Sequence, residues 1–575
     1  MIYGVGLILV LIDLADGRPF MADVDDQMRE LQIRYLMSAY GNWYDLRLPF
    51  VSMPDVYTSP WSRLVDLPYV AVAKMLMPFV SPQRAVGLAF HIWPPLMLAI
   101  FSLLAASIVQ RLMVGFELRK LSYQISLAIM TFAMTMAVLE FAPGRIDHHN
   151  AQIITMLMVI DGLARWDRRG GMMIGAGSAL SVVIGLECLP FVVVAYGGLV
   201  LCYIQGARGV RELLIAASVS MVAVTAFSAL AFIGPGGIVS TQCDAFSAPY
   251  IALMCGFSLI LGLCAAIQWA TLLRRAIVLT FLSVALLVTA GMLFPSCLAG
   301  PYSIIDPLSR ELWFDRIWQE HSFLYFYGNG QYDVLVLLAL LTAATILAFP
   351  IALAKVQARE PGLAIIYGVA LSSILVTLLL TRYIRFPAAF LSLFLPPTIA
   401  WLIDRHRFPR ARRLAASCAA AGGVGFGVLY FVIPPRNWNF DAVDYMAFSE
   451  CKGQDFSVFL KVPPGRIAVP QGLSLPVLFA APPGFSVGAV PFHRSSPGMR
   501  RMFEAFRSSD AEVRRSALAP FDYVAVCRFP LKADPKDAPL YAALAAGKSW
   551  PGLQRIEPPA KTDFQLFSID HLKLQ

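Results

Sequence analysis

Charged residues are scarce in this sequence: 14% of the 575 residues are Asp, Glu, Lys or Arg, whereas 58% are hydrophobic. The mean hydropathy is +0.65. This composition excludes an ordinary soluble globular protein and indicates a polytopic membrane protein. The net charge of +9 does not indicate nucleic-acid binding. Its basic residues gather in short clusters between apolar segments, as the positive-inside rule predicts for membrane topology.

Other common features are also missing. No cleavable signal peptide is evident, because the apolar start Met1 to Ile12 lacks a basic region and a small-residue cleavage site. That start is short for a span of ~20 residues, so the first helix either begins before Met1 or extends to about Phe20. The sequence has no CxxC or zinc-finger spacing, no internal repeat and no low-complexity segment.

Twelve further apolar runs approach the length of a membrane span. They lie at about 86–109, 121–141, 148–163, 171–186, 189–205, 213–234, 249–272, 276–294, 334–354, 362–381, 386–404 and 414–433. Together with the first helix they predict about thirteen transmembrane helices. The runs 148–163 and 171–186 are short enough to be half-spans or tilted pieces.

Basic clusters occur at every second connection, which predicts that these connections and the N-terminus are cytoplasmic. The clusters are Arg111/Arg119/Lys120, Arg165/Arg168/Arg169, Arg208/Arg211, Arg274/Arg275, Lys355/Arg359 and Arg405 to Arg413. The long loops 16–84 and 295–333 are then extracytoplasmic. We therefore expect a multi-pass protein of the inner or plasma membrane, with a membrane domain (1–433) and an extracytoplasmic C-terminal domain (434–575).

The C-terminal domain reads as a small α/β domain. Its strand-length runs are Val458–Val462, Ile467–Val469, Pro476–Ala480 and Tyr523–Val526, and a helical stretch runs from about Gly498 to Ala517. Four of the nine cysteines are exterior. The simplest pairing joins Cys451 to Cys527 within the tail and Cys243 to Cys297 between loops.

Four exterior segments carry acidic or basic residues. Asp147 and His149, at the mouth of a membrane run, offer two ligands for one divalent cation, and His148 would then point elsewhere. Alternatively, Asp147 caps a helix and the histidines lie at the membrane interface. In the first loop Asp23, Asp25 and Asp26 crowd like charges into four residues. A cation or substrate would compensate this repulsion, unless the loop is simply solvated.

The other two candidate regions lie later in the chain. Glu311 and Glu320 belong to an aromatic-rich loop, a kind that often forms a lid or a re-entrant segment. Arg382 and Arg385 lie at the outer end of a helix, where topology does not require cations. The alternative is that these two side chains only snorkel at the membrane interface.

With these features the chain resembles the GT-C superfamily of polyprenyl-linked glycosyltransferases, in particular the catalytic subunit of oligosaccharyltransferases. Asp23-Val24-Asp25 resembles the first acidic motif of that family. Gly144-x-x-Asp147-His148-His149 is similar to the archaeal form of the second motif, in which the Asp and the second His bind metal. Ile384-Arg385-Phe386 resembles the family's phosphate-contacting arginine, and Ile317-Trp318-Gln319-Glu320 loosely resembles its loop Glu motif.

The resemblance implies an enzyme that transfers a sugar from a polyprenyl-phosphate donor on the extracytoplasmic face. Asp25, Asp147 and His149 would bind Mg²⁺ or Mn²⁺, while Arg382, Arg385 and His148 would bind substrate. The catalytic carboxylates would be Asp23, Asp25, Asp26 and Glu320, one of which orients or deprotonates the acceptor. The Trp-Trp-Asp signature that reads the acceptor sequon is absent, so the acceptor is left open as a lipid, a glycan or a protein.

Two alternatives belong to other classes of protein. A secondary transporter or flippase would use the Asp, His and Glu groups as an ion or substrate path, and Glu187, flanked by apolar runs, would serve it best. Transporters usually show repeated halves with polar groups near the bilayer midplane, which this sequence does not. A non-catalytic assembly subunit is the third interpretation.

Overall fold

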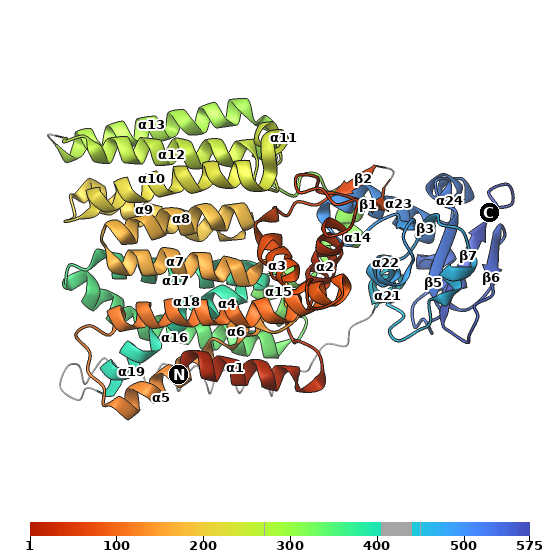
Figure 1. The fold of residues 1–575 in the computed structure, drawn as a ribbon, viewed down its shortest axis with the longest axis horizontal. Coiled ribbons are helices and arrows are strands. Elements are labelled where there is room, and N and C mark those ends of the chain that lie inside the picture. The colour runs from red at the N-terminus through yellow and green to blue at the C-terminus, as the bar shows by residue number, and fades with distance from the viewer. Residues whose placement is uncertain (54, 270, 404–439, 449, 575) are drawn as a thin grey trace. The chain divides into compact units, whose positions relative to one another are not determined.

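The computed structural model describes residues 1–53, 55–269, 271–403, 440–448 and 450–574 (Figure 1). The chain divides into two compact units. The membrane unit comprises Met1–Asp26, Trp61–Gly300 and Gln319–Arg436, and the sheet unit comprises Gln27–Pro60, Pro301–Trp318 and Asn437–Gln575. Helix α2 (Val24–Leu36) contains the first boundary between the two units.

The long elements that the structure describes in the membrane unit are helices. Its helices are α1 (Ile2–Asp13), α3 (Arg63–Leu76), α4 (Pro82–Leu112), α5 (Lys120–Ala133), α6 (Thr135–Val138), α7 (His149–Arg165), α8 (Arg168–Ile184), α9 (Leu189–Gln205), α10 (Val210–Ser228), α11 (Gly234–Val239), α12 (Ala248–Ala266), α13 (Leu272–Leu293), α15 (Phe323–Gly328), α16 (Tyr332–Gln357), α17 (Pro361–Leu379), α18 (Arg385–Ser392) and α19 (Leu395–Ile403). The apolar runs within the described residues therefore form helices, as their length and composition predict.

Seven helices of the described chain are long and apolar enough to cross a membrane, or nine if each of two bent pairs forms one span. The bends are 66° between α5 and the helical turns at Thr135–Phe141, and 46° between Thr381–Ser392 and α19. The runs predicted at 148–163 and 171–186 form α7 and α8, of 17 residues each. The predicted span 414–433 and the cluster Arg405 to Arg413 lie outside the described residues. The chain is thus a multi-pass membrane protein, and the count of thirteen stays a prediction.

Glycines bring α8 close to α10. A Cβ at Gly171 would lie 2.3 Å from the Leu213 carbonyl oxygen, and one at Gly175 would lie 2.1 Å from that of Ala217. Small residues four positions apart share one helix face, so the two backbones pack in direct contact. Any larger residue at these positions would push the helices apart.

The sheet unit is built around a seven-stranded sheet of order β2-β1-β4-β3-β5-β7-β6. Its strands are β1 (Arg47–Ser52), β2 (Val56–Thr58), β3 (Arg466–Ala468), β4 (Ser486–Val487), β5 (Tyr523–Cys527), β6 (Leu553–Ile556) and β7 (Phe564–Ile569). The neighbours β1–β4, β4–β3 and β3–β5 are parallel, and the outer pairs are antiparallel. The segment 47–58 therefore adds two strands to the sheet of the C-terminal residues, with Val51 opposite Val487.

The helices of the sheet unit correct two strand predictions. They are α14 (Pro307–Leu312), α21 (Ala442–Phe448), α22 (Ser474–Ala480), α23 (Ser496–Arg507), α24 (Ala511–Leu518) and α25 (Pro539–Ala545). The run Pro476–Ala480 belongs to α22, and Val458–Val462 overlaps a 3-10 helix at Ser457–Lys461. Short apolar runs do not distinguish strand from helix, and a proline is tolerated in the first helical turn.

The remaining strand and helix predictions for the C-terminal domain agree more closely with the structure. Ile467–Val469 and Tyr523–Val526 coincide with β3 and β5 to within one residue at each end. The predicted helical stretch forms two helices, α23 and α24, because Asp510 starts a new one by accepting a hydrogen bond from the Glu512 amide at 2.8 Å.

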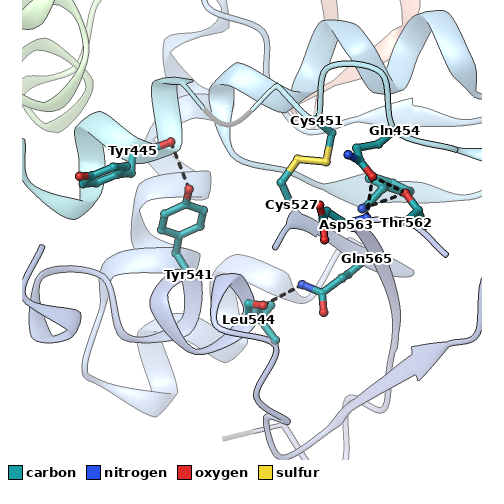
Figure 2. The surroundings of a disulfide bond; sticks show 10 residues. Tyr445, Cys451, Gln454, Cys527, Tyr541, Leu544, Thr562, Asp563 and Gln565 are labelled. Carbon is teal, nitrogen blue, oxygen red and sulfur yellow. Dashed lines mark hydrogen bonds between the residues drawn. A yellow bond between two sulfur atoms is a disulfide. The ribbon is translucent and has the colours of Figure 1, made fainter. Parts of the chain in front are cut away.

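Both predicted disulfides are present. Cys243 and Cys297 lie with their Cα atoms 5.0 Å apart, and Cys451 and Cys527 with theirs 5.7 Å apart, within the usual range. Figure 2 shows the second bond, which joins the segment after α21 to the end of β5. Nearby, the Tyr541 hydroxyl donates to the Tyr445 carbonyl at 3.1 Å, so α25 also holds α21.

Candidate metal and substrate site

The three aspartates at the start of α2 have different local roles. The Asp23 carboxylate accepts hydrogen bonds from the amides of Asp25 (3.0 Å) and Asp26 (3.3 Å), and Asp26 accepts one from the Asp23 amide (3.2 Å). This reciprocal pattern is a capping box, which satisfies amides that have no partner within the helix. The Asp25 carboxylate forms no ion pair or hydrogen bond with any described residue. Asp25 is therefore the aspartate whose side chain the local fold does not require.

Asp26 also fixes the second acidic segment. Its Oδ1 atom accepts hydrogen bonds from the amides of Ile146 (2.8 Å) and Asp147 (2.9 Å). Just before them, Gly144 has φ of +89°, a left-handed conformation that favours glycine. The turn at Gly144 thus directs the chain onto the start of α2, which places Asp147 beside the aspartates of the first loop.

A buried chain of ion pairs supports this arrangement. Arg145 is 1% exposed and pairs with Asp26, with Asp23 at 3.6 Å and with Glu140 Oε2 at 2.6 Å. Arg385, at the start of α18, pairs with the other Glu140 oxygen at 2.9 Å. Removing one partner from such a buried network would leave an uncompensated charge, so these side chains hold the backbone of the site in place.

Asp147 contacts both histidines that follow it. His148 Nδ1 lies 2.5 Å from Asp147 Oδ1, and His149 Nε2 lies 3.1 Å from Asp147 Oδ2. The prediction that His148 points elsewhere is therefore wrong in this structure. The reason is local: the His148 amide also donates to Asp147 Oδ1 at 2.6 Å, which folds the carboxylate back over the first turn of α7. The two rings lie side by side, with centroids 4.4 Å apart.

The ligand-type atoms form two groups that share Asp147. One group is Asp147, His148 and His149, and the other is Asp23, Asp25 and Asp147. Within each group the atoms lie within 4.8 Å of one another. The predicted ligands Asp25 and His149 therefore lie in different groups, and each is near Asp147.

Negative charge is in excess around these groups. Among the described residues, the contacts around Asp147 connect seven carboxylates with three guanidinium groups: Asp23, Asp25, Asp26, Glu140, Asp147, Glu187 and Glu320, with Arg145, Arg382 and Arg385. Desolvation raises the pKa of Asp26 to about 7, although Arg145 lowers it. Desolvation, together with the charges of Asp23 and Asp147, raises the pKa of Asp25 well above its usual range. A divalent cation would relieve this repulsion, and these oxygen and imidazole donors fit one.

Glu187 connects the histidines of the site to Arg382. It lies in the helical turn Leu186–Cys188, with Oε2 at 3.1 Å from His149 Nδ1 and Oε1 at 2.5 Å from Arg382 Nη2. Arg382 also pairs with Glu320. The backbone supports that second contact, because the Thr381 amide donates to the His321 carbonyl at 3.1 Å.

The similarity of this chain to known proteins is found by comparing structures, not sequences. No protein-family model matches the sequence, and no curated protein sequence matches it. Among solved structures, oligosaccharyltransferase AglB from Archaeoglobus fulgidus, in complex with an inhibitory peptide and a dolichol-phosphate, superposes with a TM-score of 0.60 at 10% identity. The match covers 100% of this chain and 75% of the AglB chain. This chain has the fold of the archaeal oligosaccharyltransferase.

Two further structures of the Archaeoglobus fulgidus enzyme agree. One is tethered to an acceptor peptide containing the NVT sequon, with a TM-score of 0.59, 11% identity and coverage of 98% of this chain and 74% of that one. The other is a complex with Zn and sulfate, with a TM-score of 0.55, 11% identity and coverage of 97% and 72%. The oligosaccharyltransferase fold thus extends over nearly the whole chain.

The structure connects most of the predicted site residues and adds others. The connected ones are Asp23, Asp25, Asp26, Asp147, His148, His149, Glu320, Arg382 and Arg385. Sequence reasoning missed Glu140, Arg145 and Gln152, and it assigned Glu187 only to the transporter alternative. A general rule could have found the two glutamates, since an acid within or at the end of an apolar run is functional by default. Glu311 belongs to α14, which is part of the sheet unit.

Proposed function

We propose that this chain is an integral-membrane glycosyltransferase that transfers a sugar from a polyprenyl-phosphate-linked donor to an acceptor on the extracytoplasmic face. The proposal includes the thirteen-span topology with a cytoplasmic N-terminus and an extracytoplasmic sheet unit. The observation that carries it is the approach of Asp25 and His149 to Asp147 within an oligosaccharyltransferase fold. The dolichol-phosphate held by the archaeal neighbour supports a lipid-linked donor.

Asp25, Asp147 and His149 would hold one divalent metal. Mg²⁺ and Mn²⁺ suit the carboxylates, and the zinc complex of a neighbour supports a divalent ion in this fold. When bound, the metal supplies positive charge to the phosphate leaving group. His148, whose ring lies beside that of His149, would contact the donor or add a further ligand.

Arg382 and Arg385 would contribute to binding of the donor phosphate in different ways. Arg382 has a side chain that is 20% exposed, so it can reach a bound phosphate while Glu187 and Glu320 orient it. Arg385 is 5% exposed and pairs with Glu140, so it contributes mainly a fixed positive charge behind the site.

The acceptor would be oriented or deprotonated by a carboxylate. Asp23 and Asp26 are already engaged in the capping box and with Arg145, which makes Glu320 the better candidate. Direct attack by the acceptor would invert the anomeric centre. The acceptor peptide of a neighbour supports a protein acceptor, whereas the missing Trp-Trp-Asp signature leaves a lipid or a glycan equally open.

Turnover of a labelled polyprenyl-phosphate sugar in proteoliposomes tests the proposal. We expect EDTA to abolish transfer and added Mn²⁺ or Mg²⁺ to restore it. His149→Ala should abolish transfer, His148→Ala should lower it less, and the matched variant His91→Ala, at an exposed position of α4, should leave it unchanged. Full activity in EDTA would overturn the metal-dependent mechanism, and transport of the lipid-linked sugar without transfer would favour a flippase.

A further inference from the structure

Glu187 lies behind both histidines of the site. His148 places Nδ1 on Asp147 and Nε2 at 3.5 Å from Glu187 Oε2, whereas His149 places Nε2 on Asp147 and Nδ1 at 3.1 Å from the same Glu187 oxygen. Each imidazole therefore bridges Asp147 and Glu187 with its two nitrogens. The Glu187 side chain is 16% exposed, so solvent screens these interactions little.

A cation at Asp147 would decide which ring nitrogens carry the protons. A neutral imidazole has one N–H and one lone pair, and a metal binds through the lone pair. A cation held by Asp147 would take the lone pairs of His149 Nε2 and His148 Nδ1, the nitrogens that face Asp147. The N–H groups would then lie on His149 Nδ1 and His148 Nε2, where the Glu187 carboxylate accepts their hydrogen bonds.

Gln152 supports one of the two rings. Its Oε1 atom lies 3.2 Å from His149 Nδ1 and accepts the hydrogen bond there. His148 has no such second acceptor among the described side chains at Nε2, so it depends on Glu187 alone. On its other side, Glu187 binds Arg382, which ties the histidines to the cation proposed for the donor phosphate.

We infer that Glu187 is a positioning residue that presents the lone pairs of His148 and His149 to a divalent metal at Asp147 and couples them to Arg382. The inference rests on the proposed metal-dependent transfer. It predicts that Glu187 affects metal affinity without touching the metal, as outer-shell carboxylates on ligating histidines do.

Titration of the purified full-length protein with Mn²⁺, followed by electron paramagnetic resonance, tests the inference without an activity assay. We expect Glu187→Gln to weaken Mn²⁺ binding by roughly 10- to 100-fold and to weaken the nitrogen hyperfine couplings of the bound ion. Glu187→Asp keeps the charge and should lose less affinity. Glu212→Gln, at an exposed position in the first turn of α10, is the matched control and should behave as wild type.

A transfer assay separates positioning from a merely structural role. If Glu187 acts through the metal ligands, excess Mn²⁺ restores most of the kcat of Glu187→Gln, whereas a distorted protein would not recover. Mn²⁺ affinity and nitrogen couplings of Glu187→Gln equal to those of wild type would overturn the inference alone. Failure of the wild-type protein to bind Mn²⁺ would overturn the proposed metal site and the inference with it.

Discussion

Helix α7 has a buried carboxylate at each end, and the two have opposite surroundings. Asp161, near the C-terminal end, is 1% exposed and meets Arg165 at 2.9 Å, Arg111 at 3.8 Å and the Ser107 hydroxyl at 2.7 Å. Asp147, just before the helix, is 2% exposed and meets two histidines and further aspartates. Both are costly to bury, and the permanent cations Arg165 and Arg111 compensate Asp161.

The difference separates a structural charge from a binding site. The fold of the described chain compensates Asp161 by itself, so nothing more is needed there. At Asp147 the fold brings several carboxylates together and leaves repulsion that a bound cation would remove. A protein keeps such an unbalanced cluster only where it contributes to function, at a cost in stability.

The largest expected effect comes from neutralising each carboxylate without changing its shape. Asp147→Asn should reduce transfer by more than about 100-fold, because a direct metal ligand should matter more than an outer-shell group. Asp161→Asn should keep most of the activity per folded molecule. Transfer assays normalised to the monodisperse fraction measure both. Equal losses in the two variants would contradict the comparison.

Stability should show the reverse order. Asp161→Ala leaves the Arg165 charge without its partner and should lower the free energy of unfolding by about 2–3 kcal/mol, somewhat less than for a fully buried pair because Arg165 is 29% exposed. Asp147→Ala removes one of several like charges and should leave the melting temperature of the metal-free protein unchanged or raised. Thermal melts in EDTA measure this, with Glu212→Ala as control.

A region outside the site sharpens the comparison further. Removing the Cys451–Cys527 disulfide with Cys451→Ala should destabilise the sheet unit by roughly 2–4 kcal/mol, since the bond closes a loop with a sequence separation of 76 residues. Mn²⁺ binding should be unaffected, because none of the ligands belongs to that unit. Non-reducing mass spectrometry should show the two peptides linked. Free thiols in protein from its native membrane would remove the basis of this prediction.

The sequence predicted the helices well because the hydrophobic length of a membrane span is a local property. Residue type and spacing predicted that Asp147 and His149 offer ligands to one cation, and the resemblance to a family added Asp25. The sequence could not show that Asp26 binds the amides of Ile146 and Asp147, since that contact joins segments about 120 positions apart.

The features that the sequence did not predict depend on side-chain direction and on contacts between distant parts of the chain. The direction of the His148 side chain depends on how the Asp147 carboxylate lies over the start of α7. Residue spacing does not specify this. The strands β1 and β2 lie within the predicted loop 16–84, and the pairing of β1 with β4 depends on residues more than 400 positions away. Glu187 looked isolated in the sequence because its partners come from α7 and from the turn before α18.

The smallest expected effect concerns the packing behind His149. Gly185 has an extended backbone that any residue can adopt, but a Cβ there would lie 3.1 Å from Gln152 Nε2 and 3.8 Å from His148 Nε2. Gly185→Ala should therefore shift Gln152 and weaken its hydrogen bond to His149 Nδ1. Because Glu187 still faces that nitrogen, Mn²⁺ affinity should fall by less than the roughly 10-fold expected when an outer-shell group is removed.

The matched control is Gly197→Ala in α9, where a Cβ would meet nothing within 4 Å. It should leave Mn²⁺ affinity unchanged, since alanine favours the helix and displaces no neighbour. Combining Gly185→Ala with Glu187→Gln gives the sharper result. If both residues act on the same imidazole, the double variant should lose more affinity than the two separate losses multiplied, because His149 Nδ1 then lacks both acceptors. Simple multiplication of the two losses would mean that Gln152 and Glu187 support different groups, and Glu187 would then act mainly through His148.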